Sequence, residues 1–286
     1  MPTAALTPAE HRLLPTDADV AHYQEHGWWI SGEIVPGEIL DGAERGMERF
    51  YAGDVDAPFP GRTRYDHFDW SPGTPGLRKN DYAGLQVREL GALSTLPIIG
   101  AVAARLASEE PVRLWHDQLL YKPAEQPGAR TNVGWHTDRQ YWSTCTSQAM
   151  LTAWVPFHPC DEQTGTITFV DGSHRWDDVG DLDFFDGNFE DSALAPAGRE
   201  IVRVPAVLRR GQVSFHHNRT IHGSGPNRSA RPRRSMAIHL QVGPNEWQDV
   251  APRPGAEAYH RNDELARRVG GRPDYADPRL FAQLWP

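Results

Sequence analysis

The feature that most constrains the fold is a change of pattern at Pro111. Before it, apolar residues recur at helical spacing over 36–51 and 90–107, and Thr16 can cap a helix that runs toward Gly27. After it, short β-rich segments bounded by turn residues follow one another at 112–122, 148–155, 166–170, 200–204, 212–216 and 235–242. Because no helical crossovers separate them, the sequence predicts a mainly β fold, an antiparallel sandwich or barrel with flanking α-helices packed outside.

The sequence predicts a single domain over residues 1–286. Its helical N-terminal part covers about 16–108 and includes a short strand at 28–34. The β core covers about 112–243, and a C-terminal tail follows at 244–286. No internal repeat and no linker that would separate two domains is visible, and a chain of this length can bury a sizeable core.

Two long segments interrupt the predicted elements. Residues 54–80 are rich in Pro, Gly and Asp, and the segment 177–198 holds seven acids between Asp177 and Asp191 without a Lys or Arg. Loops this long in a compact domain are usually functional. Both segments are therefore lid hypotheses, with a plain solvated loop as the alternative for 177–198.

The composition excludes several classes of function. The formal net charge is -9, whereas a nucleic-acid binder usually carries a basic face. Cys145 and Cys160 are too few for a disulfide framework or a Cys-based zinc site. The longest apolar run, 96–106, is too short to span a bilayer, and no secretory signal is visible. We expect a cytoplasmic protein whose partner is a small-molecule substrate, with no nucleic acid and no membrane.

The tripeptide His-x-Asp occurs twice, at His136–Asp138 and at His67–Asp69. Alternate residues of a strand point to one face, so such a tripeptide can direct two ligands at one ion. This composition also produces the tripeptide by chance, and only context distinguishes the copies. His67 lies in the Pro- and Gly-rich segment, whereas His136 is flanked by strand-like segments and aromatic residues. We therefore take His136 and Asp138 as candidate metal ligands.

A third ligand is expected far away in the sequence and near the end of a strand. His222, shortly after the predicted strand 212–216, meets this condition. Two His and one carboxylate with open positions is the pattern of non-haem iron(II) oxygenases, because a co-substrate and oxygen must also bind. His216 and His217 are rival ligands. His239 could face the barrel interior, but a core histidine with satisfied hydrogen bonds is the preferred interpretation.

Four segments carry a resemblance to a known family, namely 23–27, 134–138 with Trp142 beyond it, 172–175, and 222–229 followed by Arg233. In that order they resemble the opening helix and strand, the metal-binding segment, the Gly-Ser-His turn and the distal His and co-substrate motif of the phytanoyl-CoA dioxygenase family. The resemblance spans roughly residues 18–242. Its most specific part is the distal motif with the Arg that follows.

This resemblance implies a double-stranded β-helix, or jelly-roll, as the core of the fold. It also implies that His136, Asp138 and His222 bind iron(II), that 2-oxoglutarate is the co-substrate and that O2 is consumed. In this reading Arg233 pairs with the distal carboxylate of 2-oxoglutarate, a role suited to the planar fork of a guanidinium group.

Other arginines compete with Arg233 for this role, namely Arg228, Arg231 and Arg234. If the strand alternates, Arg233 shares a face with Ser235, whereas Arg234 shares the face of Met236, which is typical of a covered core. Arg231 precedes Pro232, where regular strand pairing is disfavoured. The alternation therefore favours Arg233.

Further residues are candidates for the same co-substrate pocket. Ser224 and Trp142 match positions that contact or cover the co-substrate in some members of the family. Gln118 and Lys122, on the strand before the metal motif, are weaker candidates.

The prediction is thus an iron(II)- and 2-oxoglutarate-dependent oxygenase that oxidises an unactivated C–H bond of a small metabolite in natural-product biosynthesis. Hydroxylation is the default outcome, and desaturation, cyclisation or epimerisation are alternatives. The acidic net charge disfavours a polyanionic coenzyme A thioester and favours a neutral or cationic metabolite. Two other classes stay open: a jelly-roll metalloenzyme without 2-oxoglutarate, and a non-catalytic metabolite-binding jelly-roll protein.

Overall fold

The computed structural model describes residues 6–126, 131–177, 179, 182–184, 188–189, 200–251 and 258–286. Within them, two antiparallel sheets lie against each other. The large sheet has the strand order β1 (Trp28–Glu33), β8 (Gln212–His217), β5 (Leu151–Pro156), β10 (Arg233–Val242), β3 (Val112–Lys122) and β13 (Gln283–Trp285), with β2 (Arg78–Asp81) also paired to β3. The small sheet has the order β4 (Val133–His136), β9 (His222–Ser224), β6 (Thr168–Val170) and β7 (Arg203–Pro205). This is the predicted double-stranded β-helix, or jelly-roll.

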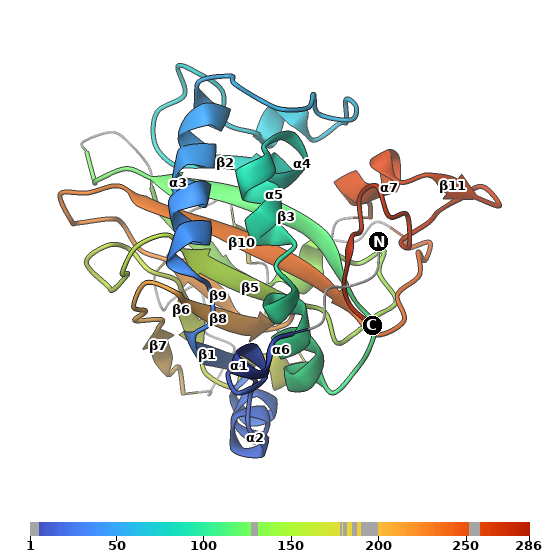
Figure 1. Cartoon of the computed structure of the whole chain (residues 1–286), viewed down its shortest axis with the longest axis horizontal. Helices are drawn as coiled ribbons and strands as arrows, with labels where there is room; N and C mark the ends of the chain where they lie inside the picture. The colour runs from blue at the N-terminus through green and yellow to red at the C-terminus, as the bar shows by residue number, and fades with distance from the viewer. Residues whose placement is uncertain are drawn as a thin grey trace.

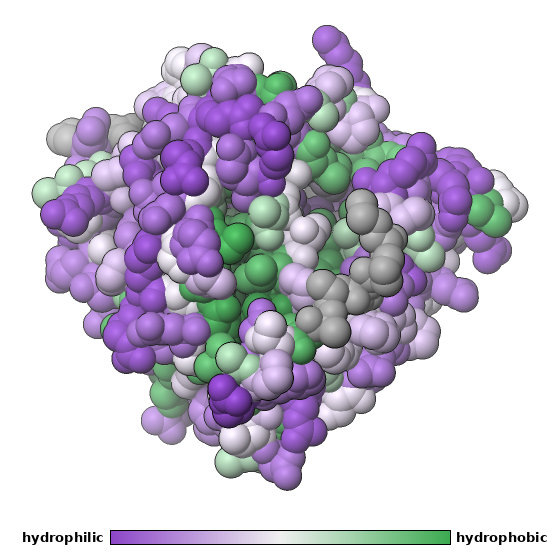
Figure 2. Space-filling view, in the orientation of Figure 1, coloured by the Kyte–Doolittle hydropathy of each residue, from purple (hydrophilic) through white to green (hydrophobic). Residues whose placement is uncertain are grey.

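Helices cover the outer face of the large sheet (Figure 1). They are α2 (Asp17–His26), α3 (Gly37–Tyr51), α5 (Arg88–Ser94) and α6 (Pro97–Ala107), with the short α1 (Pro8–His11) and α4 (Ala83–Gln86) beside them. Figure 2 shows apolar residues gathered between α3 and the α5–α6 pair, framed by hydrophilic ones. The helices and the outward side chains of the sheet form one buried core.

Local signals set where these helices begin and end. The Thr16 hydroxyl accepts a hydrogen bond from the amide of Asp19, and Gly27 adopts a left-handed φ of 77°, so α2 has the predicted limits. The single helix predicted at 90–107 is wrong, because Pro97 lacks an amide hydrogen and starts a new helix. The stretch Arg88–Ala107 is long and apolar enough to cross a membrane, but 61% of its apolar window is buried, as in the core helix of a globular protein.

Alternation along β10 separates the outer core from the interior of the barrel. Met236, Ile238 and Leu240 point outward into the helix-covered core. Arg233 and His239 lie on the opposite face and line cavities between the sheets. The predicted alternation that distinguished Arg233 from its neighbour is therefore confirmed.

A β-bulge at Trp115 interrupts the same alternation in β3. His239 pairs with His116 and Leu240 pairs with Leu114, so Trp115 has no partner in β10. The extra residue changes which residues point inward. His116, Gln118 and Lys122 consequently face the interior, although Leu114 faces outward.

Several predicted boundaries are wrong. Strand β5 begins at Leu151 and not at 148, and β7 covers Arg203–Pro205 and not 200–204. The end of the predicted loop 54–80 already belongs to β2. The two shortest strands of the site, β4 and β9, were missed, because three or four residues are too few to show alternation.

The segment 244–286, predicted as a tail, is integrated into the fold where it is described. It contains α7 (Arg261–Leu265), the short hairpin β11 (Arg268–Val269) and β12 (Arg272–Pro273), and β13, which pairs with β3. Tyr275 and Phe281 pack against Trp115 at the bulge. This packing places α7 beside the barrel, where it contributes to a cavity described below.

Asp117 on the outer face of β3 provides a test of this packing. Its carboxylate accepts a hydrogen bond from Gly84 N (3.0 Å), and burial raises its pKa to about 7. In the unfolded chain an Asp ionises near pH 3.9, so folding binds a proton between roughly pH 4 and 7 and stability falls as pH rises. The variant Asp117→Asn has no carboxyl group to ionise at this position, so its stability lacks this decrease with pH.

We expect the free energy of unfolding of Asp117→Asn, relative to the native sequence, to increase from pH 5 to pH 8 by up to roughly 3 kcal/mol, at about 1.4 kcal/mol per pH unit up to pH 7. Urea unfolding of both proteins at the two pH values measures this difference. Parallel pH dependences of the two proteins would contradict it.

Candidate metal centre and its two cavities

Three candidate ligands meet between the two sheets. His136 ends β4, Asp138 begins the 3-10 helix η2 (Asp138–Tyr141), and His222 begins β9. One donor atom from each lies within 4.8 Å of the others, and the three residues are buried. The strand therefore does not continue through the motif as predicted, but Thr137 keeps an extended backbone, so His136 and Asp138 still point to the same side.

The backbone fixes which nitrogen of each His is available. His136 Nδ1 donates to the carbonyl of Gly134 (2.8 Å), and His222 Nδ1 donates to the carbonyl of Thr220 (2.9 Å). In both rings Nε2 keeps its lone pair and is free to bind an ion. Burial lowers the pKa of both His residues, so the neutral form that binds metals is favoured.

Asp138 is oriented by a residue that sequence reasoning missed. The hydroxyl of Thr152 on β5 donates to Asp138 Oδ2 (2.6 Å), and Asp138 Oδ1 lies 3.8 Å from His222 Nε2. Burial alone would raise the pKa of Asp138. Electrostatic attraction to His222 and the hydrogen bond with His216 outweigh this effect and hold the pKa well below its usual range. The carboxylate thus stays ionised and presents one oxygen beside the two imidazoles.

Three other His residues, including the rival ligand His216, occupy positions outside the triad. His216 on β8 lies with Nε2 3.4 Å from Asp138 Oδ2, on the side of the carboxylate that Thr152 occupies. His67 lies in the short helix η1 (Asp66–Phe68) and is exposed. His174 lies in a turn near the N-terminal helix, where Nε2 is 3.2 Å from the carbonyl of Gln24.

A cavity of about 430 Å³ runs from the candidate ligands to Arg233. The Arg233 side chain is buried, and one amino group donates to the carbonyl of Gly165 (2.6 Å). Its Nε has no hydrogen-bond partner, and no carboxylate pairs with it, among the residues that the structure describes. Burial lowers its pKa to about 10, so it remains charged at neutral pH. A buried cation in this state needs an anion.

Ser224 and Gln118 line the same cavity, whereas Lys122 supports it from behind. Lys122 Nζ donates to Ser224 Oγ (2.6 Å) and to the carbonyl of Gly225 (2.6 Å). This contact fixes the segment after His222. Because Ser224 Oγ accepts that bond, its hydroxyl proton is available to the cavity beside Arg233.

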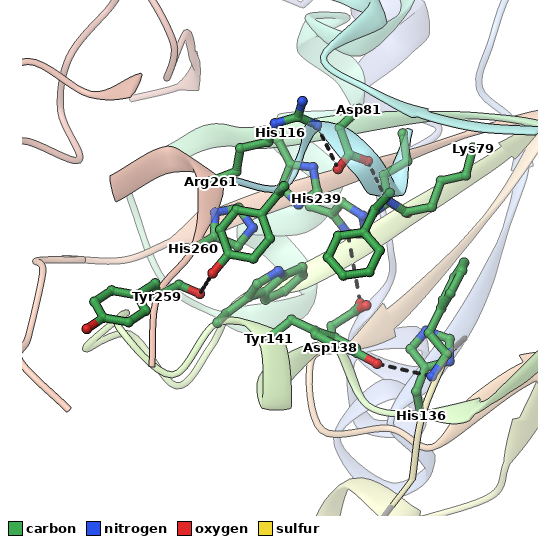
Figure 3. Close-up of a pocket in the computed structure, with 15 residues that line it drawn as sticks. Lys79, Asp81, His116, His136, Asp138, Tyr141, His239, Tyr259, His260 and Arg261 are labelled. Atoms are coloured by element: carbon green, nitrogen blue, oxygen red, sulfur yellow. Dashed lines mark hydrogen bonds and ion pairs between the residues drawn. The ribbon is translucent and has the colours of Figure 1, made fainter. Parts of the chain in front are cut away.

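A second, larger cavity of about 700 Å³ also has His136 and Asp138 in its lining (Figure 3). Trp142 lines this cavity and not the one that holds Arg233, so its position favours a substrate contact over the predicted co-substrate contact. Much of the rest of the lining comes from residues that sequence reasoning did not single out: Tyr65, Phe68, Lys79, Asp81, Tyr259, His260 and Arg261.

Both predicted lids contribute to this lining where they are described. Tyr65 and Phe68 belong to the segment 54–80. In the segment 177–198 the described Phe184 packs edge-to-face on His136, with ring centroids 4.9 Å apart. Most of that acidic segment lies outside the described residues, and its role as a lid stays a prediction.

The fold and the site define a class of protein: a jelly-roll with a two-His, one-carboxylate ligand set at the junction of two cavities. Residues 79–235 match the family model described as phytanoyl-CoA dioxygenase (PhyH). The chain belongs to this family, as its motifs predicted.

Curated relatives are similar over a part of their length. A probable alpha-ketoglutarate-dependent hypophosphite dioxygenase of Stutzerimonas stutzeri is 31% identical over 137 residues, which is 45% of this chain and 45% of that protein. The peroxisomal phytanoyl-CoA dioxygenase of Bos taurus is 25% identical over 128 residues, covering 44% of this chain and 38% of its own length. The matched region is thus less than half of these relatives.

Solved structures agree over nearly the whole chain. The non-heme alpha ketoglutarate dependent carbocyclase SnoK from nogalamycin biosynthesis has a TM-score of 0.71 at 23% identity and covers 98% of this chain and 99% of its own. EctD from S. alaskensis, solved with 2-oxoglutarate and 5-hydroxyectoine, has a TM-score of 0.67 at 19% identity, with coverages of 98% and 90%. At these identities the likeness establishes the fold.

Proposed function

We propose that the protein is an iron(II)- and 2-oxoglutarate-dependent oxygenase that oxidises a C–H bond of a small metabolite. The observation that carries this proposal is that one cavity is lined both by the metal-ligand triad and by the buried Arg233, which has no carboxylate partner among the described residues. A co-substrate that chelates a metal and ends in a carboxylate satisfies both ends at once.

The residues divide the work as follows. His136, Asp138 and His222 would hold iron(II), which together with 2-oxoglutarate and O2 supplies the oxidising chemistry. Arg233 would bind the distal carboxylate and Ser224 would donate a second hydrogen bond to it. Lys122 positions Ser224 and keeps this end of the cavity closed.

The substrate would enter through the larger cavity, which shares His136 and Asp138 with the smaller one. Hydroxylation is the simplest outcome. Ring closure, the reaction named for the similar structure SnoK, and epimerisation are alternatives that the same site can support. We also propose a natural-product substrate and a cytoplasmic location, which the sequence favoured.

A metalloenzyme without 2-oxoglutarate, the first of the two other classes that the sequence left open, gives no role to the buried charge of Arg233. In that reading a buried guanidinium would stay without an anion, which costs several kcal/mol in a low-dielectric interior.

Anaerobic titration of the purified protein with iron(II) and then 2-oxoglutarate tests the proposal. We expect a weak visible charge-transfer band that appears only when both are present. Bound iron without a band would favour the 2-oxoglutarate-independent metalloenzyme, and absence of iron binding would overturn the assignment of the site.

A further inference from the structure

The larger cavity carries information about the substrate. Aromatic rings form much of its wall, contributed by Tyr65, Phe68, Tyr141, Trp142, Phe184 and Tyr259. They come from the segment before β2, from η2, from the acidic segment and from the residues before α7. Aromatic faces and edges of this kind pack against another ring. The wall therefore favours a cyclic substrate.

The cations that line this cavity already have carboxylate partners. Lys79 Nζ lies 2.8 Å from Asp81 Oδ1 (Figure 3). Arg261 lies 2.7 Å from Asp69 and 2.6 Å from Asp66. Among the described lining residues, no cation is left for an anionic substrate. An anionic substrate would have to break one of these ion pairs, whereas a neutral one leaves them intact.

The hydrogen bonds around Asp138 determine which ring nitrogen of His239 carries the proton. The single proton of the Thr152 hydroxyl goes to Asp138 Oδ2, because an ionised carboxylate only accepts (2.6 Å). Thr152 Oγ1 therefore accepts from His239 Nδ1, 2.7 Å away. The other ring nitrogen, Nε2, is buried and has no partner among the described residues.

His116 lies beside His239 and extends the polar floor of the cavity. The two residues face each other in the β3–β10 pairing, and their ring centroids are 4.4 Å apart. His116 Nδ1 is also buried without a hydrogen-bond partner among the described residues. Buried polar atoms rarely stay unpaired, so two such nitrogens under an aromatic wall indicate a place for a polar group of a ligand.

We propose that His239 and His116 bind a hydroxyl group of a neutral cyclic substrate whose ring packs against the aromatic wall. A hydroxyl group fits because it both donates and accepts, and so it can serve either nitrogen. His239 lines this cavity together with His136 and Asp138, so the hydroxyl group is held in the cavity that the metal ligands also line. The inference rests on the proposed function, because it describes the substrate of that oxygenase.

Four naphthalene derivatives of similar size test the proposal: 2-naphthol, 2-methylnaphthalene, 2-naphthoate and 2-naphthylmethylamine. Each is titrated into the anaerobic protein loaded with iron(II) and 2-oxoglutarate, and dissociation constants are measured by ligand-observed NMR. The variants are His239→Phe and His116→Phe, which keep a ring in place, with the exposed His67→Phe as the control. His116 makes no described hydrogen bond to Thr152, which orients Asp138. The variant His116→Phe therefore tests binding of the substrate hydroxyl group separately from the orientation of Asp138.

We expect 2-naphthol to bind about tenfold more tightly than the other three probes, since a neutral hydrogen bond contributes about three- to tenfold. This preference should disappear in His239→Phe, shrink in His116→Phe and persist in His67→Phe. Equal binding of all probes, tighter binding of a charged probe, no binding of 2-naphthol, or a preference that survives in both variants would overturn the inference. If the charge-transfer band is normal in those samples, the proposed function stands; if the native protein gives no band, the proposed function fails and this inference fails with it.

Discussion

Replacing Asp138 by alanine should abolish iron-dependent turnover and weaken iron(II) binding by more than about a hundredfold. Loss of groups that only orient a ligand typically costs ten- to a hundredfold in metal affinity, and loss of the ligand itself costs more. Asp138 is the one carboxylate of the triad, so the variant also leaves two neutral imidazoles without the negative charge that helps to bind a cation. His136→Ala should have the same effect.

The second His-x-Asp tripeptide supplies a matched control. His67→Ala removes an exposed side chain from a 3-10 turn, and we expect it to keep iron and activity. Chelator competition under anaerobic conditions measures iron affinity, and circular dichroism checks that each variant is folded. Asp138→Asn, which preserves the shape of the side chain, separates loss of the ligand from loss of packing. Equal loss of iron in the His67 variant would refute the assignment.

The two His-x-Asp tripeptides show which features of the metal site could be predicted from the sequence. Context, not the tripeptide, distinguished His136 from His67, and the structure places His136 with Asp138 and His222. The strands that hold His136 and His222 were not predicted, because β4 and β9 are too short for alternation to appear. Motifs were enough to identify the ligand residues in the sequence, but their arrangement in space could be seen only in the fold.

The alternation of side chains along a strand gave a correct prediction for two neighbouring arginines. Alternation along β10 predicted that Arg233 and Arg234 point to opposite faces, and Arg234 indeed lies outside, 3.5 Å from Glu44 of α3. The same logic could not place residues on both sides of the bulge at Trp115, since an unpaired residue leaves no mark in the pattern.

The side chains that surround the triad in the two cavities were the least predictable part. Thr152 carries no motif, and its role becomes visible only when β5 is placed beside Asp138. Likewise His260 and Arg261 lie after the predicted core in the sequence. They line the larger cavity because β13 pairs with β3, which keeps the C-terminal segment against the barrel. Contacts between residues so distant in sequence depend on tertiary packing, which local patterns do not encode.

Arg233→Ala should weaken 2-oxoglutarate binding by about ten- to over a hundredfold while leaving iron(II) affinity almost unchanged. A hydrogen-bonded ion pair with a carboxylate contributes about 1.5–3 kcal/mol, and this guanidinium has no other anionic partner among the described residues. The metal ligands lie at the other end of the cavity and keep their hydrogen bonds to Gly134, Thr220 and Thr152. Titration of the charge-transfer band with 2-oxoglutarate measures the affinity.

Arg234→Ala is the matched control, because it removes the adjacent arginine from the outer face of the same strand. It should leave 2-oxoglutarate affinity unchanged, and Arg233→Lys should restore part of it, since a lysine keeps the charge without the planar fork. Thermal unfolding checks that loss of the bond to Gly165 does not unfold the Arg233 variants. If both alanine variants lose the co-substrate equally, the effect is global and Arg233 is not its anchor. If Arg233→Ala binds 2-oxoglutarate normally, the anion that this buried charge requires is a different one, and the cavity between it and the metal ligands has another occupant.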